Sequence, residues 1–330
     1  MIPTSPNKTA ILKYTAIALA VLLLISVAFF ALGVWEKQRS QFPEAPELDK
    51  TVEFDGQKYK LKDGVETFLV LGLDKYLQDD TPESYDNDKQ ADFLMLFVFD
   101  NDAQKYSAIH INRDTMTDVA RLGVAGERVG SAVEQIALAH TQGNGREVSC
   151  RNVADSVSGL LLGVNVNHYV SVTMDAVPIY NDLLGGVEVE VLEDFAGIDD
   201  TLVKGERVTL MGEHALKYVR TRYGLEDSSN STRMQRQQQY LDALREKTEK
   251  TMEQDDEFIV RASVEMSEHI VSDRSVTQLQ ELARKMSEYE FTEIYSMEGD
   301  NVVGEKFIEF YPDAESLKKI VIDLFYIAKD

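Results

Sequence analysis

The stretch ETFLVLGLD, residues 66–74, decides the fold that the sequence predicts. It is a short apolar run that stops abruptly at Asp74, and a continuous apolar strand indicates burial on both faces of a sheet. Two further strands are predicted by FLMLFVFD at 93–100 and by KYSAIHINRDT at 105–115. Later segments alternate between strand and helix patterns. This alternation predicts an α/β fold with helices on both sides of a sheet.

The remaining elements follow from periodicity and from turn residues. A hairpin that turns at Asp55-Gly56 is predicted within residues 51–61, because that dipeptide favours two-residue hairpin loops. No Pro/Gly/Ser-rich break divides the body, so one domain is expected. Further helices are expected at 116–123, 131–142, 148–162, 175–185, 211–220, 232–252 and 312–328, and two more just before residue 290. Further strands are expected at 168–174, 186–194, 290–297 and 306–312.

Residues 14–35 predict a transmembrane helix. They contain no charge, and 22 residues are enough to cross a hydrocarbon core of about 30 Å at about 1.5 Å per residue. Tyr14 and Trp35 stand at the two ends, where amphipathic aromatic residues favour the interface. A cleaved signal peptide is the alternative, but its apolar region is usually about 7–15 residues long and ends in a small-residue cleavage site. An uncleaved anchor is therefore expected.

The anchor divides the chain into predicted regions. Residues 1–13 are expected to form a cytoplasmic tail, residues 36–50 a linker, and residues 51–330 an extracytoplasmic domain, since a short tail inside and a large domain outside is the ordinary signal-anchor arrangement. The expected location is thus the cell membrane, with a single pass. One cysteine, Cys150, excludes an intramolecular disulfide and fits an export compartment that does not depend on disulfides.

A group of arginines is the main functional signal. The chain has 57 Asp and Glu against 34 Lys and Arg, a net charge of −23, yet it gathers arginines between residues 218 and 240. Guanidinium groups match phosphate oxygens with paired hydrogen bonds, so this stretch predicts a phosphate or pyrophosphate site. A solvated helix face with surface ion pairs remains the alternative. The residues of this group are Arg220, Arg222, Arg233, Arg236 and Gln237.

Carboxylates at predicted strand ends are a second signal. Asp74 ends the first central strand, Asp92 begins the second, and Arg113 and Asp114 end the third. Ligands of open α/β sheets bind beyond strand ends, and two carboxylates there suit Mg²⁺, which takes few protein oxygens. The alternative is that these residues form turns or cap helices.

Several other classes of site lack their motifs. The sequence has no G-x-x-x-x-G-K-[ST] loop, no G-x-S-x-G elbow and no Cys/His cluster with zinc spacing. His110, on a predicted strand, is expected to be a packed or hydrogen-bonded residue rather than a base. No nucleic acid is expected among the partners, and the acidic surface favours a neutral or weakly charged glycan over a strongly anionic one.

Six motifs together indicate a family. In this combination and order, the chain resembles the LytR-CpsA-Psr family of bacterial cell-envelope proteins over roughly residues 66–250. The motifs are FLVLGLD (68–74), ADFLMLF (91–97), INRDTMTDV (111–119), LLGGVEVEV (183–191), LMGEHALKYVRTRYG (210–224) and STRMQRQQQYL (231–241).

The resemblance implies a three-layer α/β/α fold with a central mixed sheet. It also implies a phosphotransferase outside the membrane, which moves a glycopolymer from a polyprenyl-pyrophosphate carrier to the muramic acid 6-hydroxyl of peptidoglycan. Asp74 and Asp92 would hold Mg²⁺, and Asp114 would orient Arg113 or support the metal shell. The residues around the pyrophosphate would be Arg113, Arg220, Arg222, Arg233, Arg236 and Gln237. Apolar helices at 131–141, 153–162 and 174–184 are candidates for the wall of a lipid tunnel.

Three departures from the family pattern leave the general base unidentified. The family usually has Arg-Ser-Asp-Thr where this chain has Gln90-Ala91-Asp92-Phe93, and it often has Pro where Asn112 stands. It usually has Asp-Phe-Gly where Asn230-Ser231-Thr232 stand. The alternative function is therefore a non-catalytic glycolipid-binding or regulatory module of the same fold.

Overall fold

A computed structural model describes residues 48–73, 89–221, 224–225, 230–255, 257–304 and 307–329. The chain divides into two compact units, Met1–Glu44 and Ala45–Asp330, and every described residue belongs to the second. The predicted tail, the anchor at 14–35 and most of the linker lie outside the described residues, so they stay predictions. None of the described helices is long and apolar enough to span a membrane.

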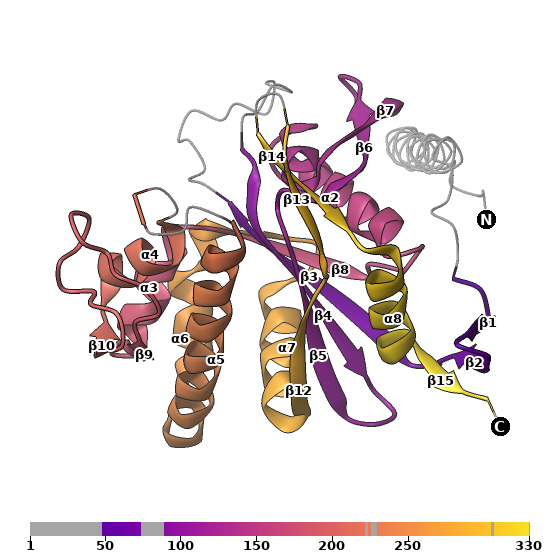
Figure 1. Ribbon diagram of the computed structural model, residues 1–330. Helices are drawn as coiled ribbons and strands as arrows, with labels where there is room; N and C mark the ends of the chain where they lie inside the picture. Colours follow the sequence, from indigo (N-terminus) through magenta and orange to yellow (C-terminus); the bar gives the residue numbers. More distant parts are fainter. Residues whose placement is uncertain are drawn as a thin grey trace, which may run out of the picture. The chain divides into compact units, whose positions relative to one another are not determined.

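A six-stranded mixed sheet forms the centre of the second unit (Figure 1). Neighbouring strands at 65–73, 91–100 and 105–111 are antiparallel, whereas the strands at 168–173 and 290–296 each run parallel to a neighbour. This confirms the expected α/β fold with a mixed sheet. In order across the sheet, the strands are β11 (Ile270–Ser272), β8 (His168–Thr173), β3 (Val65–Leu73), β4 (Ala91–Asp100), β5 (Lys105–Ile111) and β12 (Glu290–Ser296).

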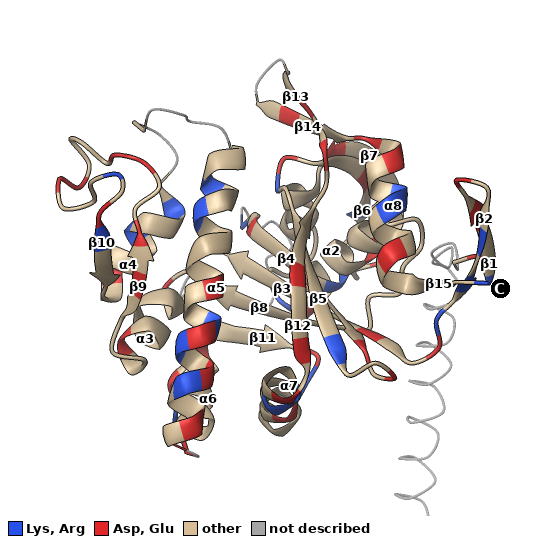
Figure 2. Cartoon of the chain, turned by 60° about the horizontal axis from the view of Figure 1, so that its bottom comes forward, with Lys and Arg blue, Asp and Glu red and all other residues tan. Residues whose placement is uncertain are grey.

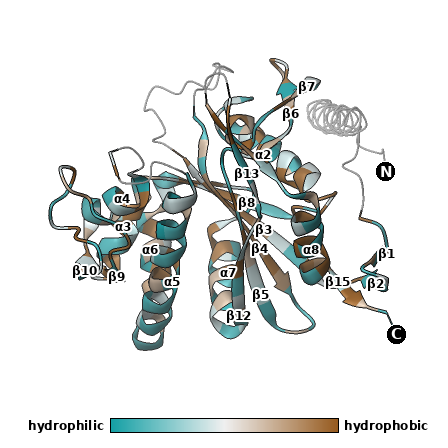
Figure 3. Cartoon of the chain, viewed as in Figure 1, coloured by the Kyte–Doolittle hydropathy of each residue, from teal (hydrophilic) through white to brown (hydrophobic). Residues whose placement is uncertain are grey.

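Strand β3 is buried on both faces, as its continuous apolar sequence predicts. Side chains alternate along a strand, so Leu69, Leu71 and Leu73 belong to one buried cluster, whereas Phe68 and Val70 pack in another on the opposite face. Figure 3 shows the apolar strands between helices whose outer turns are hydrophilic.

Helices cover both faces of the sheet (Figure 1). The face that carries Leu69 packs against η1 (Ile136–Thr141), α2 (Glu147–Leu160) and α8 (Ala314–Phe325). The opposite side of the sheet carries α3 (Ala176–Leu183), α4 (Gly212–Arg220), α5 (Asn230–Gln254), α6 (Phe258–Glu265) and α7 (Val276–Glu288).

Small sheets stand around this centre. Their strands are β1 (Thr51–Phe54) with β2 (Gln57–Leu61) and β15 (Tyr326–Ala328), β6 (Met116–Leu122) with β7 (Arg128–Gln135), β9 (Val187–Glu190) with β10 (Arg207–Leu210), and β13 (Gly299–Val303) with β14 (Ile308–Pro312). A single turn of 3-10 helix, η2 (Ser267–His269), precedes β11.

The predicted hairpin turn is confirmed. Strands β1 and β2 are joined at Asp55 and Gly56, which have φ angles of +48° and +75°. Two successive residues with positive φ define the turn type that Asp-Gly favours, because glycine adopts that region without steric cost and aspartate tolerates it.

Two of the predicted helices are wrong. The segment 116–123 contains β6 (Met116–Leu122) instead, and residues 131–142 begin within β7 and become a 3-10 helix only at Ile136. The two segments form an antiparallel hairpin in which Val119 lies opposite Ala132, so each satisfies the backbone hydrogen bonds of the other. Short apolar patterns do not distinguish strand from helix unless the pairing partner is known. The C-terminal helix also ends early, at Phe325, because the next residues pair with β2.

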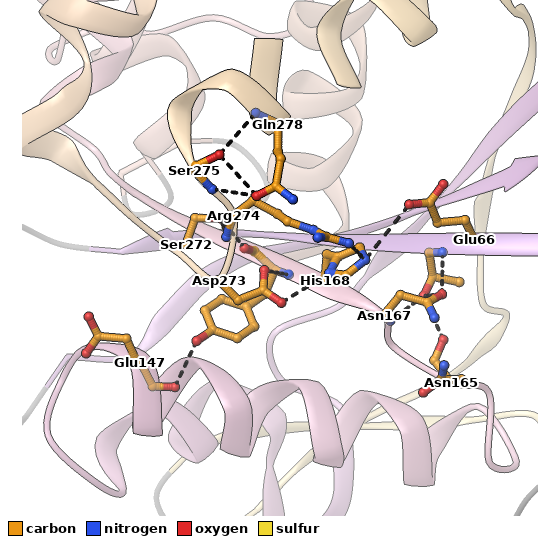
Figure 4. Close-up of polar contacts among 12 residues, drawn as sticks. Glu66, Glu147, Asn165, Asn167, His168, Ser272, Asp273, Arg274, Ser275 and Gln278 are labelled. Carbon is orange, nitrogen blue, oxygen red and sulfur yellow. Dashed lines mark hydrogen bonds and ion pairs between the residues drawn. The ribbon is translucent and has the colours of Figure 1, made fainter. Parts of the chain in front are cut away.

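A polar network at the start of β3 and β8 ties the segment after β11 to the sheet (Figure 4). Asp273 accepts hydrogen bonds from the backbone N–H of Tyr169 at 3.1 Å and from Nδ1 of His168 at 3.1 Å. Arg274 donates to the other ring nitrogen of His168. Because a ring nitrogen that accepts carries no hydrogen, the proton of a neutral His168 lies on Nδ1, facing Asp273.

We expect Asp273→Ala to lower the free energy of unfolding by about 2–3 kcal/mol, because hydrogen bonds to a charged acceptor are worth about 1.5–3 kcal/mol. Urea unfolding of the full chain in detergent micelles measures this. The matched control is Asp300→Ala, which removes an exposed carboxylate and should change stability by less than about 0.5 kcal/mol. Equal effects of the two substitutions would contradict a stabilising role for the network.

Candidate functional site

Three strand ends meet at one edge of the central sheet. In the β3–β4 pairing Leu73 lies opposite Ala91, and the β4–β5 register places the residues after Ile111 beside Asp92. The end of β3, the start of β4 and the end of β5 are therefore neighbours. Asp74 follows β3 directly but lies outside the described residues, so the predicted approach of the two carboxylates stays a prediction.

Arg113 is held between the strand ends. Its Nη1 contacts the carboxylate of Asp92 and its Nη2 donates to Oε1 of Gln90, while its Nε lies 3.5 Å from Oδ1 of Asp114. The side chains of Arg113 and Asp92 are 15% and 17% exposed, so this ion pair is largely removed from water. The predicted orienting role of Asp114 fits its contact with Arg113. Gln90 stands where the family pattern has arginine, and here it is a hydrogen-bond acceptor for Arg113.

The turn after β5 is fixed by side chains. Oδ1 of Asn112 accepts a hydrogen bond from the backbone N–H of Asp114 at 3.0 Å, and Thr115 Oγ1 donates to the carbonyl of Asn112 at 2.6 Å. The first of these is an Asx-turn, in which an asparagine side chain replaces a backbone acceptor. Gln135, at the end of β7, donates to Oδ1 of Asp114 at 3.0 Å and to the carbonyl of Ile308 at 2.7 Å. The buried Asp114 is thus oriented from two sides.

Asn230, the first residue of α5, joins that helix to the turn after β5. Its Nδ2 donates to Oδ1 of Asn112 at 2.5 Å, and its Oδ1 accepts a hydrogen bond from Nη2 of Arg233 at 2.6 Å. The three side chains are buried. Two of the departures from the family pattern are therefore bonded to each other. Since Asn230 carries an amide whose groups are both engaged, it does not act as a base.

Arg236 lies in a different environment from the one that the sequence predicts. It is 1% exposed, its Nε lies 2.6 Å from Oε1 of Glu193, and its Nη atoms donate to the carbonyls of Tyr218 and Thr221. The guanidinium also lies over the rings of Phe195 and Tyr218, at 5.2 and 5.8 Å from their centroids. This geometry favours a structural role, in which Arg236 binds the end of α4, and its contact with pyrophosphate stays a prediction.

The remaining predicted phosphate ligands, Gln237, Arg220 and Arg222, do not share one environment. Gln237 is buried and donates to the carbonyl of Val219 at 3.2 Å, so it too holds the end of α4. Arg220 is exposed at the last position of α4, and Arg222 lies outside the described residues. Figure 2 shows basic residues on the first turns of α5 and at the end of α4. Arg113 and Arg233 are thus joined to the strand-end network.

An apolar cavity of about 230 Å³ lies next to these strand ends, between the sheet and α3 and α5. Gly72 and Phe93 line it. Gly72 directly precedes Leu73, the last residue of β3, and Phe93 directly follows Asp92. A side chain at Gly72 would lie 2.8 Å from Cβ of Phe93, so the glycine keeps the cavity open on the sheet side. Other lining residues are Val70, Val172, Met174, Val177, Tyr180, Gln237, Tyr240, Leu241 and Leu244.

The cavity borders one of the three segments that were expected to wall a lipid tunnel. Only the segment 174–184 borders it. The segments 131–141 and 153–162 contribute Ile136, Val153 and Val157 to the core on the opposite face of the sheet. Their apolar residues serve packing, and the cavity is lined instead by strand residues and by α5, because the sheet separates the two layers.

His110 is packed in the core, as expected. It is 1% exposed and its ring centroid lies 5.0 Å from that of Phe93. Burial and, to a lesser degree, the charge of Arg233 lower the pKa of His110 to about 3. The imidazole is therefore neutral near pH 7.

The donor set fits Mg²⁺ in part. Asp92 places one carboxylate at the site edge, and Mg²⁺ is often bound by one or two carboxylates together with waters and phosphate. Within the described residues no group of three or more His, Cys, Asp or Glu could hold a metal ion. Binding of Mg²⁺ thus depends on Asp74 as the second ligand and stays a prediction.

The fold and the site define a class of α/β proteins, in which a strand-end site with arginines lies beside an apolar cavity. The model of the LytR_cpsA_psr family matches residues 34–323, and the chain therefore belongs to that family. The resemblance found in the sequence is confirmed. No curated protein matches the sequence.

Solved structures share the fold. TagV of Bacillus subtilis is 22% identical, with a TM-score of 0.59, over 80% of this chain and 97% of that one. TagT bound to LI-WTA is 20% identical, with a TM-score of 0.59, over 86% and 96% of the two chains. The protein gbs0355 from Streptococcus agalactiae is 17% identical, with a TM-score of 0.63, over 78% and 87%.

Sequence reasoning missed several residues of the site. Gln135 orients Asp114, and Glu193 orients Arg236. Neither Gln135 nor Glu193 belongs to a motif that indicates such a role. Gln90, Asn112 and Asn230 were marked only as departures from the family pattern. Their pairing with each other and with arginines is visible only in the tertiary structure.

We expect Arg236→Met to destabilise the protein by about 3–5 kcal/mol, because it leaves the buried carboxylate of Glu193 without its partner. The double variant Arg236→Met/Glu193→Met should recover part of this loss, which urea unfolding measures. Lys250→Met, on the exposed part of α5, is the control and should change stability by less than about 1 kcal/mol. If Arg236 has only a structural role, the double variant also keeps its affinity for pyrophosphate. A stable double variant that no longer binds pyrophosphate would instead support direct contact.

The two buried histidines predict a pH dependence of stability. Burial lowers the pKa of His110 to about 3 and that of His140 to about 4, whereas an unfolded chain binds a proton at each below a pH of about 6.5. Between those values the unfolded state holds more protons, so stability falls as the pH falls, by up to about 1.4 kcal/mol per pH unit for each histidine. In urea unfolding at pH 7, 6 and 5, His110→Phe should make the free energy of unfolding depend less steeply on pH, because the contribution of His110 is removed. An unchanged slope would contradict the neutral state of His110.

Proposed function

We propose that this protein is a membrane-anchored phosphotransferase, held by residues 14–35, that moves a glycopolymer from a polyprenyl-pyrophosphate carrier to peptidoglycan. Membership of the LytR_cpsA_psr family supports a role in the transfer of cell-wall glycopolymers. The likeness to TagT bound to LI-WTA supports a glycopolymer as partner. The expected location, outside the cytoplasm at the cell membrane, is part of the same proposal.

One juxtaposition carries the proposal. The strand ends that bear Asp92 and Arg113 are continuous with Gly72 and Phe93, which line the apolar cavity. A ligand that combines an apolar chain with an anionic head group fits such a site, since the chain is removed from water while the head group meets guanidinium groups. A polyprenyl pyrophosphate has this composition.

The residues present suit phosphoryl transfer. The acceptor hydroxyl oxygen forms a bond to the phosphorus next to the sugar, and the bond from that phosphorus to the bridging oxygen breaks, so that polyprenyl phosphate leaves. Positioned positive charge stabilises the phosphate oxygens in such a reaction, and little covalent chemistry remains for the protein. Arg113, which is fixed by Asp92 and Gln90, supplies charge without having to reorganise. The hydroxyl proton passes to a carboxylate at the strand ends or to water.

Mg²⁺ held by Asp74 and Asp92 would neutralise charge on the pyrophosphate when bound. The contact between Asp92 and Arg113 then orients the carboxylate that the metal would use. Asp114, buried against Gln135 and close to Nε of Arg113, fits a positioning role better than a proton-accepting one.

A non-catalytic glycolipid-binding module is the second candidate. The observation that favours it is Asn230, an amide where the family pattern has a carboxylate, bonded to Asn112 and Arg233. Such a site retains what is needed for binding, whereas a proton acceptor at this position is missing.

We expect the full chain in detergent micelles to release polyprenyl phosphate from a lipid-pyrophosphate saccharide when Mg²⁺ and peptidoglycan fragments are present. Arg113→Lys should lower kcat by about 10²–10³, the usual effect of removing one positioned donor, because lysine lacks the fork that reaches Asp92 and Gln90 together. Lys250→Met on the exposed part of α5 is the control and should match the wild type. Equal turnover by Arg113→Lys and the wild type would contradict the role of Arg113.

The same assay separates the two candidate functions. A wild type that binds the lipid-pyrophosphate saccharide but turns over with no acceptor supports the binding module and ends the catalytic proposal. Asn230→Asp serves as the companion variant. A strong gain in turnover would show that the amide at this position weakens the natural enzyme.

A further inference from the structure

A second cavity, of about 400 Å³, lies along the edge of the central sheet. Strand β11 is the edge strand, and all three of its residues, Ile270–Ser272, line the cavity. Successive side chains of a strand point to opposite faces, so a cavity that touches all three lies along the outer edge of β11. No other described strand pairs with that edge. Its outward N–H and C=O groups are therefore able to pair with an added extended chain.

Helices supply the walls of this cavity. Helices α6 and α7 line it on one face of the sheet, and Arg146, which directly precedes α2, lines it on the other. The cavity is open to solvent, because Val276 is 48% exposed and the side chain of Arg146 is 52% exposed. Its volume lies within the range of about 300–1,000 Å³ that is usual for ligand sites. The apolar side chains of its walls include Ile259, Ala262, Leu279 and Ala283.

The charged side chains of the lining are mainly basic, although the chain has a net charge of −23. Arg146 and Arg274 line the cavity, and Glu147 is the one acidic residue among its described lining residues. Arg274 donates to His168 and interacts with Glu66, so part of its charge is balanced (Figure 4). Guanidinium groups beside an open strand edge suit an extended peptide that carries carboxylates.

The cavity lies within reach of the strand-end site. Ile270 is opposite Val172, which is level with Gly72, and Gly72 is opposite Phe93. The first residue of β11 is therefore level with the residue after Asp92. Three strand spacings of about 4.8 Å separate β11 from β4, a distance of about 14 Å. An extended peptide of five residues spans up to about 17 Å, so it bridges this distance.

We propose that the outer edge of β11 binds the peptide that peptidoglycan carries on its muramic acid. The inference rests on the proposed function, in which that sugar is the acceptor, and it names how the acceptor is held. Such a peptide is short and has backbone amides that match a strand edge, small side chains that match the apolar walls, and free carboxylates that match Arg146 and Arg274. The sugar hydroxyl then lies at the strand ends while the peptide follows the sheet edge.

The lipid chain of the carrier is the alternative occupant. Tyr180 and Met266 line both this cavity and the apolar one, so the two cavities are neighbours. A lipid chain, however, would use neither the strand edge nor the arginines. The experiment therefore separates a peptide from a lipid.

The first arm compares two acceptors in the transfer assay with the full chain in detergent micelles. One is a peptidoglycan fragment with its peptides, and the other is the same fragment after an amidase has removed them. Removal should raise the KM about tenfold at unchanged kcat, the effect of losing a hydrogen bond and an exposed ion pair. Equal KM values for the two acceptors would overturn the peptide site and leave the proposed function intact.

A charge reversal localises the effect. Arg146→Glu should raise the KM for the intact fragment about fivefold, as the loss of a partly exposed ion pair predicts, and should not change the KM for the stripped fragment. Arg207→Glu, the same change at an exposed arginine of β10, is the control and should match the wild type with both acceptors. An Arg146→Glu variant that is folded by thermal unfolding but behaves like the control would contradict the proposed contact.

The second arm measures binding without turnover. A muramoyl pentapeptide with a photoreactive diazirine on its peptide should label segments within residues 259–283. Ala283→Phe, which fills the cavity without changing its charge, and Arg146→Glu should each lose most of the labelling while remaining folded. Labelling elsewhere, or labelling that polyprenyl phosphate displaces, overturns the peptide site and in the second case assigns the cavity to the lipid chain. Labelling of the cavity without any transfer would keep the peptide site and end the proposed function.

Discussion

The hydrogen bond between Asn230 and Asn112 is the contact on which the site depends. It fixes the first turn of α5 against the turn after β5, and Arg233 completes it by donating to Asn230. Helix α5 in turn forms one wall of the apolar cavity. If this helix moved relative to the sheet, the apolar cavity and the arginines of the strand ends would lose their common geometry. A buried pair of amides suits this task because each group must be matched, which allows one arrangement and penalises others.

The departures from the family pattern compensate for one another. Gln90 replaces an arginine and accepts a hydrogen bond from Arg113, so the guanidinium that remains is held by an amide and by Asp92. Asn112 and Asn230 replace a proline and an aspartate and bond to each other. Either asparagine alone would lack this partner in a buried place, whereas Gln90 is satisfied by Arg113 itself. Together they keep the site satisfied, although they change its charge, because an amide accepts a hydrogen bond without contributing a negative charge.

Three of the arginines that were expected around the pyrophosphate lie in two different environments. Arg113 and Arg233 are tied to the strand ends, where a phosphate could meet them. Arg236 is enclosed by Glu193, two carbonyls and two aromatic rings, and it holds α4 against α5. A buried guanidinium needs such a partner, since removing a charge from water is costly unless it is paired and hydrogen-bonded. The spacing of Arg233 and Arg236 by three residues does not distinguish these roles, because the two side chains meet different neighbours.

The sequence by itself determined the elements whose signals are local. The continuous apolar run at β3, the Asp55-Gly56 turn and the long helix after residue 230 follow from periodicity and turn chemistry, and the ordered motifs indicated the family. Tertiary structure decided what depends on partners far along the chain. Residues 116–122 form a strand because residues 128–135 pair with them, and Arg236 is buried because Glu193 reaches it. The apolar cavity and the bond between Asn112 and Asn230 likewise join segments over 100 residues apart. Backbone pairing, burial and charge compensation act between neighbours in space, and one-dimensional patterns carry no record of which neighbours those are.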